Sequence, residues 1–255
     1  MSSPDGPDAA IYYHELGVGA HRAGRLDEAE RFYNQSLAVS TRFGNQHQML
    51  AAYHQLGMVA QFRDHLDQAE DYYLKALGIA ERLGDQNVIG MSYQQLGIVA
   101  QHRGKVDEAA GWFTKSLAIR RQLGDQQGMA SCYHHLGAVA HLNRRYDQAE
   151  KYYMAALEIK MKTGNPLSLA PTLGQLGVLA EDRGQYRAAL EWTIRCVALF
   201  PQFPHPGTAH APAALARLTP LAGGIGALEK CWREVTNNPL PQTVRDFVTS
   251  YRGEG

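Results

Sequence analysis

The chain has 255 residues, of which 45% are hydrophobic and 20% charged, so it can bury the core of one large domain or two small ones. Lysine plus arginine and aspartate plus glutamate each number 25, and this balance argues against a general binder of nucleic acid or of anionic membranes. Because there is no secretory signal pattern and no apolar stretch near the roughly 20 residues that cross a bilayer, we expect a soluble cytoplasmic protein.

A unit of 40 residues recurs along most of the chain. The dipeptide Leu-Gly stands at Leu16, Leu56, Leu96, Leu136 and Leu176. An alanine follows each leucine after four residues and another after thirteen, and an aromatic residue comes next at Tyr33, Tyr73, Phe113 and Tyr153. Units close on Gly-Asn or Gly-Asp, as at Gly44-Asn45 and Gly84-Asp85. Such periodicity predicts a repeat fold rather than a single globular core.

Each unit reads as two helices. The first runs through the Leu-Gly motif, and the second starts near an acid such as Asp27 or Asp67, which can cap free N–H groups or complement the helix dipole. The closing glycine can adopt the left-handed conformation that ends a helix, and the next Asn or Asp can cap the following helix. No segment alternates apolar and polar residues with period two, so we expect no strands.

In chain order, we predict a disordered terminus at 1–8 and five repeats within 9–200. The repeats span about 9–45, 46–85, 86–125, 126–165 and 166–200. The segment 201–255 begins with a Pro-rich loop. A degenerate helix pair, Ala209 to Leu221 and Gly226 to Thr236, and a last helix, Thr243 to Tyr251, follow it. This segment caps the solenoid, covers the groove or pairs with a second protomer, so a dimer is one possible state.

The recurring Leu-Gly, alanine, aromatic and small-residue positions resemble the tetratricopeptide repeat (TPR) family, in the 40-residue form of kinesin light chains and bacterial regulatory proteins. The resemblance covers roughly residues 9 to 200. It implies an all-α, right-handed superhelical α-solenoid of antiparallel helix pairs, in which the first helices line a concave groove. A tyrosine replaces the family's frequent early tryptophan, and most second helices lack the closing proline.

At 100° per residue, the Leu-Gly motif and its alanine share one helix face, and neutral polar and apolar residues share the opposite face. We predict that this opposite face is a ligand-binding groove. Its residues are His14, Val18, His21, His54, Met58, Gln61, Met91, Gln94, Ile98, Gln101, His134, Ala138, His141 and Glu181. Amides and imidazoles beside an apolar floor suit a peptide backbone. Histidines near a reference pKa of about 6.5 could also make binding pH-sensitive.

The three histidines of the stretch YHHLGAVAH do not form a predicted metal site. His134 and His141 lie about 10.5 Å apart along a helix, and metal ligands stand about 2 Å from their ion. Cys132, Cys196 and Cys231 are widely spaced and indicate reduced, buried thiols. We predict no metal, no cofactor and no catalytic residue, because no P-loop, GxSxG, GxGxxG or HExxH motif is present.

The expected function is non-catalytic binding of a peptide or protein segment in the groove, as an adaptor or regulatory module. One alternative is an unusual enzyme or small-molecule binder that uses His14, His54, His134 and His141. Another is a peptide-sensing regulator, since bacterial quorum-sensing receptors share the long repeat type. We expect no nucleic-acid partner and no membrane contact.

Overall fold

The computed structural model describes residues 6–208 and 210–251, and within these ranges it contains α-helices, one short 3₁₀ helix and no strand. The predicted all-α fold of antiparallel helix pairs is therefore confirmed. Residues up to Asp125 form one compact unit, unit 1, and those from Gln126 onward form another, unit 2. No helix in the described ranges is both long and apolar enough to span a membrane.

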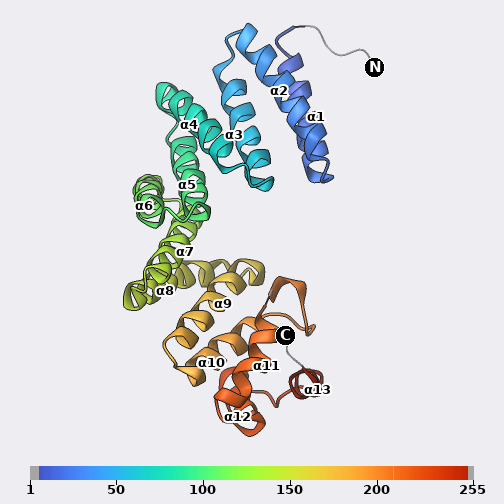
Figure 1. The fold of residues 1–255 in the computed structure, drawn as a ribbon, viewed down its shortest axis with the longest axis vertical. Helices are drawn as coiled ribbons and strands as arrows, with labels where there is room; N and C mark the ends of the chain where they lie inside the picture. Colours follow the sequence, from blue (N-terminus) through green and yellow to red (C-terminus); the bar gives the residue numbers. More distant parts are fainter. Residues whose placement is uncertain (1–5, 209, 252–255) are drawn as a thin grey trace. The chain divides into compact units, whose positions relative to one another are not determined.

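Unit 1 contains three helix pairs (Figure 1). Its helices are α1 (Ala9–Arg22), α2 (Leu26–Arg42), α3 (Gln46–Phe62), α4 (Leu66–Leu83), α5 (Gln86–His102) and α6 (Val106–Gln122). Residues 6–8 form a turn that leads into α1, and residues 1–5 of the predicted disordered terminus lie outside the described part. Each first helix packs against its own second helix, and α2 and α4 also pack against the first helix of the next repeat.

Unit 2 contains two further repeats and the C-terminal segment (Figure 1). Its helices are α7 (Gln126–Leu142), α8 (Tyr146–Thr163), α9 (Pro166–Asp182), α10 (Tyr186–Val197), η1 (Pro206–Thr208), α11 (Ala211–Leu221), α12 (Ile225–Thr236) and α13 (Gln242–Ser250). The predicted start of the degenerate pair, Ala209, lies outside the described residues. Helices α11 and α12 both pack on α10, and α13 packs on α11.

Helix ends follow the local signals in the sequence. The side chains of Asn45, Asp85 and Asn165 accept hydrogen bonds from backbone N–H groups two or three residues later, which satisfies donors that a helix start leaves free. Gly84 and Gly164 end α4 and α8 with φ values of 70° and 63°, in the left-handed region. Both predictions are confirmed.

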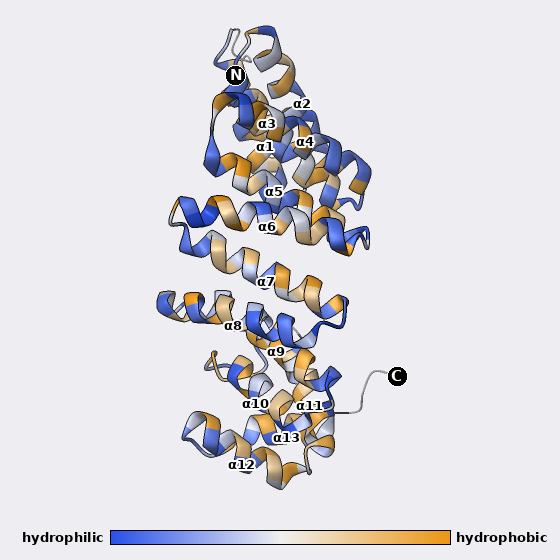
Figure 2. Cartoon of the chain, turned by 90° about the vertical axis from the view of Figure 1, so that its left-hand side faces the viewer, coloured by the Kyte–Doolittle hydropathy of each residue, from blue (hydrophilic) through white to orange (hydrophobic). Residues whose placement is uncertain are grey.

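In the first four pairs the core forms where a glycine meets an aromatic ring, whereas in the fifth pair Gly177 meets Thr193. A Cβ on Gly57 would lie 2.6 Å from the ring of Tyr73, and the same distance separates Gly97 from Phe113 and Gly137 from Tyr153. These aromatic side chains are fully buried. Only a residue without a Cβ lets the two helices approach this closely. The helices are banded with apolar and polar residues along their length (Figure 2), as helices packed on one side must be.

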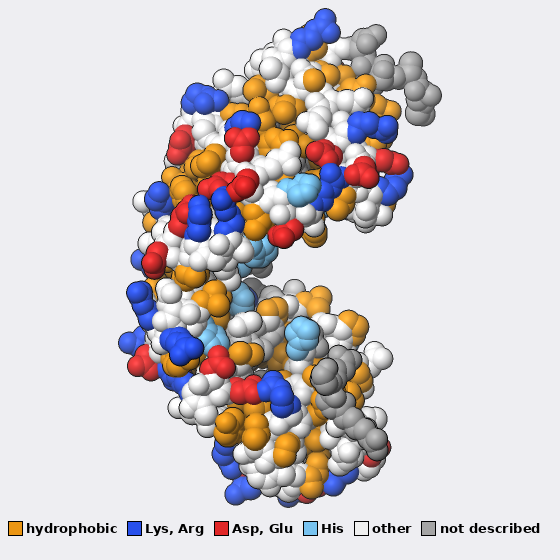
Figure 3. Space-filling view, in the orientation of Figure 1, with side chains coloured by type: hydrophobic (Ala, Val, Ile, Leu, Met, Phe, Trp, Pro, Cys, Tyr) orange, Lys and Arg blue, Asp and Glu red, His pale blue; other side chains and the backbone are white. Residues whose placement is uncertain are grey.

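The acidic residue near the start of the second helix does not cap that helix, contrary to one of its two predicted roles. Asp27 and Asp67 each lie one residue inside a helix whose N-cap makes no side-chain bond. They bind the arginine that follows the next first helix. Arg63 contacts Asp27 and Glu30, and Arg103 contacts Asp67 and Glu70, so each arginine joins two neighbouring repeats. Acidic and basic side chains accordingly lie side by side on unit 1 (Figure 3).

We expect the Arg103–Glu70 pair to contribute modestly to stability, because both side chains are only 26% exposed. A double-mutant cycle with Arg103→Gln and Glu70→Gln should give a coupling energy of about 0.5–1 kcal/mol at low ionic strength. Urea denaturation measures it. The coupling should shrink at about 1 M salt, where the Debye length is about 3 Å. A smaller coupling is expected for the more exposed Lys75–Asp71 pair, and a salt-independent value for Arg103–Glu70 would contradict the interpretation.

Candidate functional site

The predicted groove residues lie on the first helices α1, α3, α5, α7 and α9. None of the fourteen is buried: Met91 is exposed and the others are half-buried. Four of the five leucines of the Leu-Gly motif, such as Leu56 and Leu96, are in contrast almost fully buried, and Leu16 is half-buried. The structure therefore places the two residue sets at different depths, with the candidate ligand-binding set accessible and the scaffold set in the core.

A cavity of about 540 Å³ opens between α1, α2 and α3 in unit 1, and we call it the first-repeat cavity. It contains three of the predicted groove residues, Val18, His21 and Met58. Its other lining residues are Arg22, Gly24, Leu26, Tyr33, Gln55 and Phe62. Most of this wall is apolar. The imidazole of His21 and the guanidinium of Arg22 come from the end of α1, and no acidic residue is among the lining residues.

Unit 2 has a second cavity, of about 420 Å³, which we call the fourth-repeat cavity. Among the predicted residues it contains His134, and it adds His135, Ser131 and Lys160 from α7 and α8 and Asn165 before α9. Lysine is the only charged residue type in this lining. The two cavities differ in chemistry, since the first has a mainly apolar wall and the second is rich in hydrogen-bond donors.

A hydrogen-bonded chain connects three side chains at the fourth-repeat cavity. The Lys160 ammonium donates to Thr172 Oγ1 at 2.7 Å, and the same oxygen lies 3.1 Å from Nδ1 of His134. The Thr172 hydroxyl already accepts from lysine, so its proton is available to a neutral imidazole that carries its own proton on Nε2. In that tautomer the His134 Nε2–H is a donor.

Burial keeps several groove histidines neutral. It lowers the pKa of His134 to about 3, and the nearby Lys160 and His135 act in the same direction. Burial also lowers the pKa of His54, and that of His14 despite the opposing effect of Glu15. These three histidines therefore do not provide the protonation switch near their reference pKa that the sequence suggested as one possibility. They act as neutral hydrogen-bonding groups near pH 7.

Other groove residues already have partners within the chain. Gln61 accepts a hydrogen bond from the Tyr73 hydroxyl at 3.0 Å, and Glu181 forms an ion pair with Arg217. His141 Nε2 lies 2.7 Å from a carboxylate oxygen of Asp182. This histidine–carboxylate contact has the residue types of an acid–base pair, but the Asp182 side chain is 50% exposed, whereas general acid–base catalysis favours a site that excludes water.

Metal-ligating and thiol groups are dispersed. Among the residues that the structure describes, no group of three or more His, Cys, Asp or Glu side chains could hold a metal ion. Cys132, Cys196 and Cys231 are buried and form no disulfide, as the sequence indicated. Burial raises the pKa of Cys196 and of Cys231 to about 11, so both are protonated thiols near neutral pH and poor nucleophiles.

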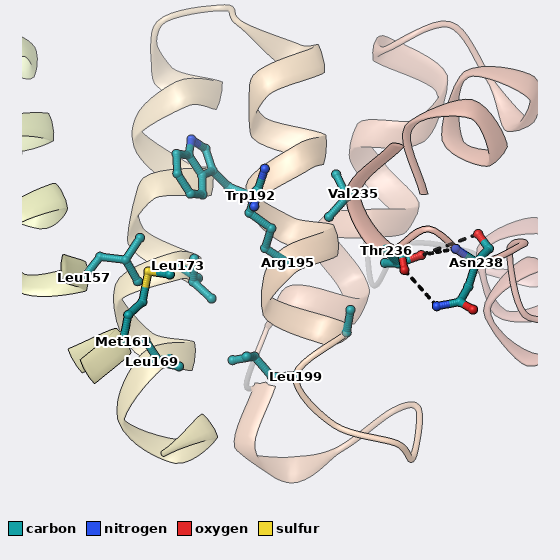
Figure 4. Close-up of a pocket in the computed structure, with 11 residues that line it drawn as sticks. Leu157, Met161, Leu169, Leu173, Trp192, Arg195, Leu199, Val235, Thr236 and Asn238 are labelled. Carbon is teal, nitrogen blue, oxygen red and sulfur yellow. Dashed lines mark hydrogen bonds between the residues drawn. The ribbon is translucent and has the colours of Figure 1, made fainter. Parts of the chain in front are cut away.

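Sequence reasoning missed an apolar cavity in unit 2, of about 410 Å³, away from the predicted groove residues (Figure 4). Leu157 and Met161 of α8, Leu173 of α9 and Trp192 of α10 line it. Thr236, the last residue of α12, and Asn238, two residues later, border its far side and are hydrogen-bonded to each other. The cavity joins second helices of different repeats, and no single helix pattern could reveal it.

Lys160 was also missed. The corresponding positions of the first two repeats hold the small residues Ser40 and Ala80. The third and fourth repeats hold the basic residues Arg120 and Lys160 there, and this change from small to long basic side chains was the signal available in the sequence.

The family model for the tetratricopeptide repeat matches residues 7–82, 48–122, 88–162 and 128–202. These overlapping matches cover most of the chain, which therefore belongs to the tetratricopeptide repeat family. Repeats of this family mediate protein–protein interactions. The search among curated proteins finds no match.

Solved structures show the same fold at low sequence identity. BtubC (BKLC) of P. vanneervenii is 20% identical, with a TM-score of 0.69 over 90% of this chain and 94% of the other. A Signal Transduction ATPase with Numerous Domains (STAND) protein with a tetratricopeptide repeat sensor, from Pyrococcus horikoshii, is 16% identical, with a TM-score of 0.76 over 92% of this chain but 37% of the other. A kinesin light chain-type protein of Podosopora anserina with nearly identical TPR-like repeats is 20% identical, with a TM-score of 0.63 over 77% and 97%.

Proposed function

We propose that the protein is an adaptor or regulatory module that binds a peptide or protein segment along the exposed face of its first helices. The observation that carries this proposal is that each unit has a cavity on the first helices that includes predicted groove residues, three in the first-repeat cavity and His134 in the fourth-repeat cavity. A cavity of about 300–1,000 Å³ is the size in which proteins hold small ligands.

The chemistry of the face supports a peptide rather than a polyanion. Gln94 and Gln101 of α5 carry amides that can both donate to and accept from a peptide backbone, and Ile98 lies between them. The neutral state of His54 and His134 adds further uncharged donors and acceptors. Met58 and the exposed Met91 have flexible thioether side chains that can adapt to irregular apolar groups.

Selection from a display library of random 15-residue peptides on the full chain tests the proposal. We expect peptides whose affinity falls about tenfold or more in the double variant Ile98→Ala and Gln101→Ala, because both side chains are half-buried on the face of α5. The matched control removes the exposed Asp71–Lys75 pair of α4 by two alanine substitutions and should leave affinity unchanged.

Selected peptides that bind the groove variant and the parent chain equally would reject this face as the binding site. A selection that yields no peptide at all would reject the peptide-binding function itself. The likeness to a protein whose tetratricopeptide repeats are described as a sensor favours a regulatory role over a purely structural one. For this chain we propose only that its repeats bind a ligand.

A further inference from the structure

Tyr33 departs from the equivalent tyrosines of the other repeats. The Tyr73 hydroxyl donates to Gln61 at 3.0 Å, and the Tyr153 hydroxyl donates to Gln175 at 3.4 Å. Tyr33 is fully buried, lines the first-repeat cavity, and has a buried hydroxyl without any hydrogen-bond partner. A buried polar group without a partner is destabilising, so such groups are rare and often mark a ligand's place.

The two positions that supply hydrogen-bond partners to Tyr73 and Tyr153 supply none to Tyr33. His21 stands where the second repeat has Gln61, and its ring packs edge-to-face against Phe62, with centroids 5.3 Å apart at 87°. Gln55 stands where the fifth repeat has Gln175. Both His21 and Gln55 line the same cavity as Tyr33. The two positions that could supply a partner for the hydroxyl therefore both border the cavity.

The free hydroxyl is a donor. Burial raises the pKa of Tyr33 to about 12, against the opposing effect of Arg22, so the phenol keeps its proton at all ordinary pH values. Around it the wall is apolar, with Val18, Leu26 and Met58, while Phe62 is 68% exposed and offers a free ring edge or face at the mouth. A matching ligand group needs an apolar, flat body and a terminal acceptor oxygen.

We propose that the first-repeat cavity is a subsite for a tyrosine side chain of the bound protein segment, whose phenolic oxygen accepts a hydrogen bond from Tyr33. This inference rests on the proposed peptide-binding function. A phenylalanine would leave the Tyr33 hydroxyl unpaired. A carboxylate could pair with Arg22, which lines the cavity, but it would lose its hydration against Val18, Leu26 and Met58. Among protein side chains, tyrosine combines an aromatic body with a terminal oxygen that accepts a hydrogen bond.

The test uses p-cresol as the probe for a tyrosine side chain and toluene as its counterpart without the hydroxyl. The full chain is labelled with ¹³C-methyl methionine, and the Met58 methyl signal reports occupancy because Met58 lines the cavity. We expect p-cresol to shift this signal, and its dissociation constant to rise about tenfold in Tyr33→Phe. The matched variant Tyr73→Phe should leave it unchanged, since that hydroxyl is already bonded to Gln61.

A second variant tests the same hydrogen bond by giving the Tyr33 hydroxyl a partner within the chain. His21→Gln restores the residue of the second repeat and should give Tyr33 an internal partner, so p-cresol binding should weaken by a similar factor while Tyr33 is kept. Toluene should bind the parent chain and all three variants with similar affinity. An unchanged affinity for p-cresol in Tyr33→Phe and in His21→Gln, or the absence of any shift at Met58, would overturn the proposal.

The outcomes separate this subsite from the wider function. If p-cresol fails while selected peptides still depend on Ile98 and Gln101, the tyrosine subsite is wrong and the peptide groove stands. If p-cresol binds as expected but peptide selection yields nothing, the cavity binds a phenol, and the proposal that this phenol belongs to a bound protein segment is wrong. Selected peptides that carry a tyrosine, and lose affinity in Tyr33→Phe but not in Tyr73→Phe, support both.

Discussion

Replacing Gly97 by alanine is expected to lower the free energy of unfolding by about 1–3 kcal/mol, the usual range for overpacking a core. The new Cβ would lie 2.6 Å from Cε1 and 2.8 Å from Cδ1 of Phe113, a ring that is fully buried and cannot turn aside. Alanine also favours the helix by up to about 1 kcal/mol over glycine, but this gain is smaller than the expected steric cost. Urea denaturation of the two proteins measures the difference.

Gly111→Ala is the matched control. Gly111 lies inside α6, and a Cβ there would meet nothing within 4 Å, so the substitution should stabilise the protein by up to about 1 kcal/mol. The double variant Gly97→Ala with Phe113→Leu should be less unstable than the sum of its parts, because a smaller side chain leaves room for the methyl group. Strict additivity, or a Gly97→Ala protein as stable as the parent, would show that the close approach is not what the glycine provides.

This glycine could be understood from the sequence, because the Leu-Gly motif and the later aromatic residue recur at fixed distances. Local signals set the helix ends as well: Asn45 and Asp85 cap helices, and Gly84 and Gly164 end them. Each of these effects acts within a few residues along the chain or through one repeated packing contact. The repeat fold and the depth of its residues could therefore be predicted before the structure.

Other features depend on contacts between residues far apart in sequence. Asp67 could be placed at a helix start from the sequence, but its ion pair with Arg103 requires the next repeat to be in place. Lys160 of α8 meets Thr172 of α9, the first helix of the next repeat. Tyr33 and Tyr73 occupy the same repeat position, and only the packing of His21 against Phe62 shows why one hydroxyl is bonded and the other is not. The chemistry of the candidate subsites lies in such departures from the repeat.

The acid sensitivity of the fold should depend on His134. Its pKa is about 3 in the folded protein, mainly because of burial and then because of Lys160 and His135, and 6.5 is the reference value. As the pH falls, the unfolded chain takes up this proton first. The stabilisation is therefore fully present above about pH 6.5 and is lost progressively between about pH 6.5 and pH 3.

Between pH 7 and pH 5 this one group should lower the free energy of unfolding by about 2 kcal/mol. His134→Gln should remove most of that loss, because the amide does not titrate and can still reach Thr172, as Gln94 occupies the same position in the third repeat. Urea midpoints of the parent and the variant at pH 7, 6 and 5 measure it. His54, whose pKa burial also lowers, contributes a decline that both proteins share.

The reciprocal variant Gln94→His gives the matched comparison. It introduces an imidazole at a half-buried position between those of His54 and His134 in the repeat series, and it should steepen the loss of stability toward pH 5. Equal pH profiles for the parent chain and His134→Gln would mean that the imidazole becomes protonated without unfolding. The hydrogen bond from Thr172 to Nδ1 would then be lost to an imidazolium beside Lys160, and the lowering of the His134 pKa by burial would be wrong.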